Sequence, residues 1–172
     1  MNQQDPRLLI DGYNLLFQSN LVGKGRGPKW LDVARARLIT FLEQHLTPDI
    51  CKTTQVVFDA SSSGGRLQGS FSSAGIEITF ANEHPEADDL LEYIIRRHSH
   101  PKNLRVVSSD QRIRRCARAR RAESVDSESF IRQLESQPQG SARNAGLEQL
   151  SEEPQLSNTE VDYWLREFEG GS

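Results

Sequence analysis

Five aspartates of this chain follow segments with the composition of buried strands or open a nearby helix. Asp11 ends the run RLLID, Asp59 ends QVVFD, Asp110 follows LRVVSS, and Asp88 and Asp89 begin a helical pattern. Side chains at the carboxyl ends of parallel strands meet at one edge of a sheet, so we expect these acids to approach one another. Carboxylates that lie so close together raise one another's pKa unless a cation is present. Mg²⁺ prefers a few carboxylates together with water molecules as its ligands. The pattern predicts a divalent-metal site, which suits phosphodiester hydrolysis.

Each of these carboxylates also has an explanation that involves no chemistry. Asp88 or Asp89 at a helix start would cap the helix and complement its dipole, and Asp110 could cap the helix that follows it. Asp59 could simply open the Ser-rich segment behind it. Asp11 is the hardest to explain in this way, because a charge directly after an apolar strand is costly without a partner. The two cysteines and four histidines do not have the spacing of a competing zinc site.

The segments that must position these acids alternate between strand and helix patterns. Strands are predicted at 7–11, 55–59, 76–80, 104–107 and 122–125, and helices at 30–45, 87–98, 113–121 and 127–134. Residues 61–73 are rich in Ser and Gly, which predicts a loop. Strands that alternate with helices indicate an α/β fold, in which helices cover both faces of a parallel sheet.

Four short motifs at these positions resemble those of the NYN domain, and specifically those of the YacP-like nucleases. In chain order they are DGYN at 11–14, VFD at 57–59, EADD at 86–89 and VVSSD at 106–110. Each motif alone is short, but four of them in this order, at the ends of the expected elements, form a specific signal. The resemblance covers about residues 7–134 and does not reach the tail from residue 135 onward.

The resemblance implies a PIN-like fold, a three-layer α/β sandwich with a central, mostly parallel sheet flanked by helices. It also implies an acidic Mg²⁺ or Mn²⁺ site that cleaves RNA. By the same resemblance the catalytic residues are Asp11, Asn14, Asp59, Asp88 and Asp110. Asp11, Asp88 and Asp110 would hold the metal, and Asn14 would orient water, metal or Asp11. Residues implied to add a further acid, or to hydrogen-bond the carboxylates or a phosphate, are Glu86, Asp89, Ser108 and Ser109.

Arginines crowd the helix that is predicted after Asp110. They are Arg112, Arg114, Arg115, Arg118, Arg120 and Arg121. At about 100° per residue, Arg114, Arg118 and Arg121 share one face of that helix. Guanidinium groups bind phosphate oxygens in a two-pronged geometry, so the helix is a candidate to position an RNA backbone, and the alternative is a solvated face. The residues of this helix predicted to bind RNA are Arg112, Arg114, Arg115 and Arg118.

A second basic segment, GKGRGP at 23–28, lies close in the chain to the end of the first strand. It lacks the Gly-Lys-Ser/Thr sequence of a P-loop, so it does not predict nucleotide hydrolysis. Lys24 and Arg26 could form a lid over single-stranded RNA, or the segment could be a plain connection. Aromatic residues nearby could stack on a base, although such residues more often fill a core or its rim. The three aromatic candidates are Tyr13, Phe17 and Trp30.

Charge is distributed unevenly along the 172 residues. Residues 1–134 hold 19 Lys and Arg against 16 Asp and Glu, a net charge of +3, whereas residues 135–172 have a net charge of −6. A basic body with an acidic tail is compatible with nucleic-acid binding. We predict a nuclease domain at 1–135, a flexible acidic linker at 136–157 and a short amphipathic helix at 158–169. This helix would either pack back on the domain or bind a partner.

The prediction for the whole chain is a metal-dependent endoribonuclease that acts in the cytoplasm on single-stranded RNA, with the ribosome as a further candidate partner. Apolar runs are only a few residues long, so no membrane-spanning helix is expected, and MNQQDPR does not have the composition of a secretory signal. The alternative is a PIN-like module that binds RNA or the ribosome through a degenerate site. The retained acids disfavour that alternative, because without a metal they would repel RNA. A phosphatase for small esters is disfavoured by the Arg-rich helix, which suits a polymer.

Overall fold

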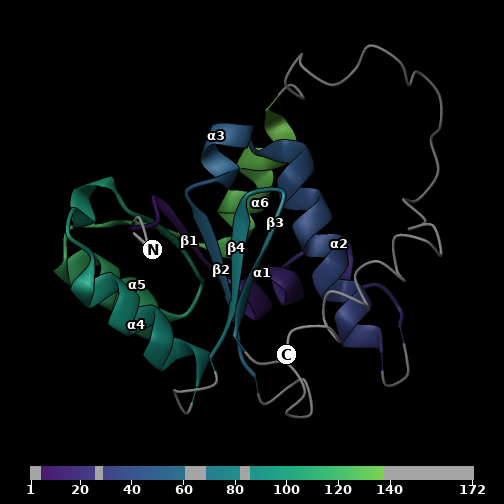
Figure 1. Ribbon diagram of the computed structural model, residues 1–172, viewed down its shortest axis with the longest axis horizontal. Helices are drawn as coiled ribbons and strands as arrows, with labels where there is room; N and C mark the ends of the chain where they lie inside the picture. The colour runs from purple at the N-terminus through teal and green to yellow at the C-terminus, as the bar shows by residue number, and fades with distance from the viewer. Residues whose placement is uncertain (1–4, 26–28, 61–68, 82–85, 138–172) are drawn as a thin grey trace.

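Strands and helices alternate along the part of the chain that the structure describes, residues 5–25, 29–60, 69–81 and 86–137 of a computed structural model (Figure 1). The strands of these residues are β1 (Leu8–Asp11), β2 (Thr54–Phe58), β3 (Ser70–Ser73), β4 (Ile76–Phe80), β5 (Arg105–Val107) and β6 (Glu123–Val125). They form one sheet in the order β3-β4-β2-β1-β5-β6. Within this sheet β3 runs antiparallel to β4, and the other pairings are parallel. The predicted α/β fold with a mostly parallel sheet is confirmed.

Helices cover both faces of this sheet. They are α1 (Gly12–Gln18), α2 (Trp30–His45), α3 (Pro48–Cys51), α4 (Ala87–Arg97), α5 (Gln111–Ala119) and α6 (Ser127–Ser136), with the 3-10 turns η1 (Asn20–Val22) and η3 (Pro101–Asn103). The helices α4 and α5 pack against each other on one face, whereas α1, α2 and α6 contribute to the core on the other face (Figure 1). The result is the three-layer arrangement that the sequence predicted.

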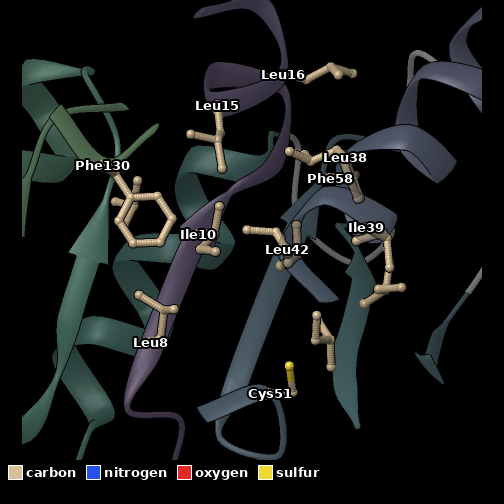
Figure 2. Close-up of a cluster of buried hydrophobic side chains, with 14 of the residues drawn as sticks. Leu8, Ile10, Leu15, Leu16, Leu38, Ile39, Leu42, Cys51, Phe58 and Phe130 are labelled. Atoms are coloured by element: carbon tan, nitrogen blue, oxygen red, sulfur yellow. The ribbon is translucent and has the colours of Figure 1, made fainter. Parts of the chain in front are cut away.

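The central strand β1 supplies both halves of the hydrophobic core. Successive side chains of a strand face opposite sides of a sheet. Leu8 and Ile10 therefore join the cluster beneath α1, α2 and α6 (Figure 2), and Leu9 joins the cluster beneath α4 and α5. Full burial of one such side chain stabilises the fold by about 1.5–3 kcal/mol. By the same alternation, Asp11 at the end of β1 belongs to the face that α4 and α5 cover.

One strand was not predicted. Residues 61–73 were expected to form a loop; residues 61–68 lie outside the described part of the chain, but Ser70–Ser73 form β3 and pair with β4. The turn between the two strands has positive φ at both central residues, 47° at Ala74 and 88° at Gly75, as tight hairpins require. The prediction was wrong because this edge strand holds a single large apolar residue, Phe71, and its turn has Ala where Asn or Asp usually gives the signal.

Two helices were also not predicted. The helix α1 begins directly after β1, and Asp11 caps it by accepting a hydrogen bond from the backbone N–H of Asn14. The single turn α3 starts after Thr47, which caps it, and has Pro48 at its first position. Both helices are short, so the hydrophobic periodicity that reveals longer helices has too few residues to show itself.

The Arg-rich helix α5 lies two residues earlier in the chain than predicted. It runs over Gln111–Ala119, and Arg120 caps its end. Arg121 has a φ of 61°, which is incompatible with a continuing helix. Arg121 therefore does not share a helix face with Arg114 and Arg118, and this part of the prediction was wrong.

The tail predictions are not tested by the described residues. The linker beyond Gln137 and the predicted helix at 158–169 lie outside them. Of the helices that the structure describes, none has both the length and the apolar composition needed to cross a bilayer.

Candidate active site

Asp11 lies at the centre of the carboxyl edge of the sheet and is almost fully buried. Its side chain is 7% exposed, and its Oδ2 accepts a hydrogen bond of 2.9 Å from the Ser108 hydroxyl. Its Oδ1 accepts a bond of 3.2 Å from the backbone N–H of Asn14. The residue that follows must be glycine, because a Cβ on Gly12 would lie 2.4 Å from the ring of Phe58. The Asp-Gly pair thus lets α1 turn away from β1 in direct contact with the end of β2.

Asp88 and Asp110 bring two further negative charges to Asp11. The pKa of Asp11 is raised to about 6: burial is the largest cause, the charges of Asp88 and Asp110 also raise it, and the bonds from Ser108 and Asn14 lower it. Burial and the charge of Asp110 likewise raise the pKa of Asp88. The three acids that the resemblance assigned to the metal therefore lie within electrostatic reach of one another, although they come from β1, α4 and the start of α5.

Ser108 joins two of these acids. It is fully buried after β5, donates its hydroxyl hydrogen to Asp11 and accepts a bond of 3.1 Å from the backbone N–H of Asp110. Asp110 in turn caps α5 by accepting a bond of 2.6 Å from the N–H of Arg112. The capping role that the sequence offered as an alternative for Asp110 is thus real. It does not exclude a metal-binding role, because one carboxylate can accept several bonds.

Asn14 is held from two sides through its amide oxygen. Its Oδ1 accepts a bond of 2.8 Å from the backbone N–H of Ser109 and another of 2.8 Å from the hydroxyl of Ser127. Because a backbone N–H can only donate, the atom that faces it must be the amide oxygen. The NH₂ group of Asn14 donates no hydrogen bond to the described residues. Ser127 itself is fully buried at the start of α6, where its N–H donates to the Ser109 hydroxyl at 3.1 Å.

Ser127 was not among the predicted site residues. It follows Asp126, which caps α6 by accepting a bond of 2.9 Å from the N–H of Ser129. A polar residue in the first turn of a helix is common for structural reasons alone. Its contact with Asn14 joins positions 113 residues apart, and a contact of that range leaves no local signal in one sequence.

Asp89 has surroundings quite different from those of Asp88. Its Oδ1 accepts a bond of 2.6 Å from the guanidinium of Arg112, which also donates a bond of 2.9 Å to Glu92. Glu92 is 8% exposed and receives a second bond, of 2.8 Å, from Arg96. Arg112, predicted to bind RNA, thus joins α5 to α4 by two ion pairs. The hydrogen bonds that it donates to Asp89 and Glu92 raise the pKa of its guanidinium.

Asp59 directly follows β2, the strand beside β1, and its charge acts on Tyr13. Burial raises the pKa of the Tyr13 hydroxyl, the charge of Asp59 raises it further, and Arg35 lowers it. Arg35 is completely buried in α2; it donates to the Tyr13 hydroxyl, pairs with Asp32 and lies 5.5 Å from the ring of Phe80. The sequence did not predict this group, because a buried arginine within a helix has the same local pattern as an exposed one.

The remaining predicted residues are placed as follows. Glu86 is exposed at the start of α4, where its charge contributes to the raised pKa of Asp88. Lys24, Arg115 and Arg118 are exposed, and Arg114 is partly buried. Arg26 lies outside the described residues. Among the described residues, no three His, Cys, Asp or Glu side chains are grouped closely enough to hold a metal ion as they stand.

Comparison with known proteins agrees with the motifs. The model of the YacP-like NYN domain family matches residues 8–169. The match therefore includes the tail, which the motif resemblance had left out. The crystal structure of Rae1 (YacP) from Bacillus subtilis has a TM-score of 0.57 and 21% sequence identity over 77% of this chain and 74% of that one. Its Trp-to-Leu variant gives the same score and identity over 74% of each chain. No curated protein matches the chain.

Proposed function

The chain belongs to the YacP-like NYN domain family, and from this we propose that it is a divalent-metal-dependent endoribonuclease. One observation carries the proposal. Three carboxylates from separate elements, Asp11, Asp88 and Asp110, interact electrostatically: burial is the main cause that raises the pKa of Asp11 to about 6, and the charges of Asp88 and Asp110 add to it. Carboxylates in that arrangement repel one another, and binding a cation relieves the repulsion.

The donor set fits a hard divalent cation. Asp11, Asp88 and Asp110 offer carboxylate oxygens, which Mg²⁺ and Mn²⁺ prefer. Mg²⁺ commonly keeps several waters and takes only one or two carboxylates directly. The three acids are the proposed ligands, in direct contact or through water. When bound, the ion would polarise the phosphodiester and lower the pKa of a water molecule.

The chain's own residues would orient the substrate around those acids. Ser108 fixes the rotamer of Asp11 through its hydroxyl and links it to the start of α5. Asn14 has both bonds at its amide oxygen occupied by Ser109 and Ser127, so its NH₂ group remains to donate to a phosphate oxygen. We therefore propose that Asn14 acts as a hydrogen-bond donor rather than as a metal ligand.

Basic side chains would bind the RNA backbone. Arg115 and Arg118 are exposed on α5, the helix that Asp110 caps, so they carry positive charge on the same element that bears one of the acids. Arg114 on the same helix and Lys24 and Arg26 in the segment after η1 are further candidates. A single strand is the proposed substrate form, because its backbone can bend to bring one phosphate to a buried acid such as Asp11. The ribosome stays a candidate partner, and a cytoplasmic location stays a prediction.

Cleavage of end-labelled single-stranded RNA in Mg²⁺ or Mn²⁺ tests the proposal. We expect cutting that EDTA abolishes and that is lost in Asp11→Asn and Asp110→Asn, with a DNA strand as the specificity control. If the wild type binds metal but does not cut, the assay is repeated with translating ribosomes. Cutting that appears only in their presence would point to a required partner. RNA binding without metal binding or cutting would overturn the proposal in favour of a degenerate RNA-binding module.

A further inference from the structure

A chain of aromatic rings runs from the core to the surface and ends at Phe17 on α1, the helix that Asp11 caps. Phe71, Phe80 and Phe58 follow one another with ring centroids 6.3 and 5.8 Å apart. Phe58 meets Tyr13 edge-on at 5.0 Å, and Tyr13 stacks on Phe17 at 5.9 Å with 25° between the planes. The first four rings are buried or partly buried, whereas Phe17 is 59% exposed. The exposed ring is thus the surface end of a stack that is anchored in the core.

The inner neighbour of Phe17 is rigidly held. Tyr13 is fixed by its contact with Phe58 and by the hydrogen bond that its hydroxyl accepts from the fully buried Arg35. Phe17 lies one helical turn beyond Tyr13, so the backbone of α1 fixes their spacing. A ring oriented in this way loses little conformational freedom when a second planar group stacks on it.

The same short helix carries Phe17 and is capped by Asp11. Six residues separate the two, which corresponds to about 9 Å along a helix axis. In Figure 1, α1 lies at one end of the sheet between the α4–α5 pair and α2. Residues 12–25 and 29–31 contain Lys24 and Lys29 and no Asp or Glu. An aromatic ring in a basic segment, a helix away from a buried acid, suits a ligand that has both a planar ring and a negative charge.

We propose that Phe17 is a stacking subsite for one unpaired nucleobase of the RNA, next to the phosphate that approaches Asp11. This inference rests on the proposed function. Of the three aromatic candidates in the sequence, Tyr13 is already packed between Phe58 and Phe17, and Trp30 is partly buried with its Nε1 bonded to the carbonyl of Val22 at 3.2 Å. Stacking tolerates any base, because every base has a π-face, so the subsite would add affinity without strong sequence preference.

Binding of a fluorescein-labelled 12-nucleotide single strand in Mg²⁺, with Asp11→Asn present in every protein compared so that the RNA is not cut, tests this subsite. We expect Phe17→Ala to weaken binding about 5- to 50-fold, as the loss of one base–aromatic stack predicts, and Phe17→Trp to stay within about threefold. Tyr93→Ala is the matched control, because Tyr93 is a similarly exposed aromatic, 48% exposed, on α4. We expect Tyr93→Ala to bind like the wild type.

An RNA with one abasic position scanned along the strand supplies the second measurement. At the position that stacks on Phe17, removing the base should weaken the wild type and leave Phe17→Ala unchanged. If the wild type binds RNA but Phe17→Ala binds as tightly as Tyr93→Ala, or if no abasic position removes the difference, the stacking inference is overturned while the nuclease proposal stands. A wild type that neither binds nor cuts RNA overturns both.

Discussion

Neighbouring acids on α4 have opposite electrostatic surroundings. Asp89 and Glu92 face Arg112, which bonds both at 2.6 and 2.9 Å, and Glu92 also bonds Arg96. Asp88, the residue before Asp89, forms no ion pair among the described residues; burial and the charge of Asp110 raise its pKa, and the charge of Arg112 only partly opposes them. Asp89 and Glu92 are thus neutralised by arginines, whereas Asp88 adds its negative charge to those of Asp11 and Asp110.

The contrast separates acids that stabilise the fold from acids that destabilise it. Where stability alone selects the residues, a partly buried carboxylate is normally paired, as Glu92 is. Asp11 is more deeply buried than Asp89, yet the charged groups that act on it most are the negative Asp88 and Asp110. A protein that retains such repulsion has an arrangement suited to a cation or a reacting group, which is where perturbed carboxyl groups gather.

The largest expected effect comes from substituting the two adjacent aspartates one at a time. Asp88→Asn should reduce metal-dependent RNA cleavage by at least about 100-fold, because it removes a charge from the proposed metal site. Asp89→Asn should reduce cleavage by about fivefold or less, because it weakens a partly exposed ion pair with Arg112. Single-turnover cleavage of one RNA by both variants measures the ratio. Equal losses would show that the two aspartates act together and that the contrast has no functional meaning.

The next effect concerns stability and its dependence on pH. The pKa of Asp11 is raised from 3.8 to about 6, so the folded protein takes up this proton more readily than the unfolded chain. Stability therefore falls as pH rises from about 4 to 6 and stays lower above that, by an amount that two pKa units put near 3 kcal/mol. Asp11→Asn removes the charge, so in EDTA at pH 8 it should be about 1–3 kcal/mol more stable than the wild type.

Urea unfolding at pH 4 and pH 8 tests this sign. The gain of Asp11→Asn should vanish at about pH 4, where Asp11 is protonated in the folded state. Asp49→Asn is a suitable control, because Asp49 is exposed and its only ion pair in the described residues, with Lys52, is 3.9 Å long. A variant that is less stable than the wild type at pH 8 would contradict the idea that the site acids destabilise the metal-free fold.

The acids could be singled out from the sequence because each is local to a strong signal; their role in a metal site stays a prediction. Asp11 and Asp110 follow short runs of β-branched or aliphatic residues, and the order of those runs predicted the parallel sheet. What failed was either too short for a periodic pattern, as α1 and β3 were, or dependent on contacts between distant positions. Arg112 shows the second case: its sequence context is a crowd of arginines, and only the packing of α5 on α4 reveals that it faces Asp89 and Glu92.

A smaller effect is expected at Ser127, which helps to orient the NH₂ group of Asn14. Ser127→Ala removes one of the two hydrogen bonds that hold the amide oxygen of Asn14. A lost bond of this kind corresponds to roughly a tenfold fall in cleavage rate. The same change in an Asn14→Ala background should have no further effect, because the residue it positions is already gone. Ser129→Ala, on the same helix, is the control; a loss of rate equal to that of Ser127→Ala would show only that α6 is disturbed.

The smallest effect distinguishes the arginines of α5. Arg115 and Arg118 are exposed and make no ion pair among the described residues, so Arg115→Gln and Arg118→Gln should each weaken single-strand binding about two- to fivefold at low salt and lower the salt slope by up to about 0.7. Arg112→Gln should change binding by about twofold or less, since its guanidinium already neutralises Asp89 and Glu92. Titrations at several salt concentrations measure both quantities. If Arg112→Gln lowers the salt slope as much as Arg115→Gln does, then the Arg112 side chain gives up its ion pairs with Asp89 and Glu92 in order to bind RNA. Those two acids would then belong to the site.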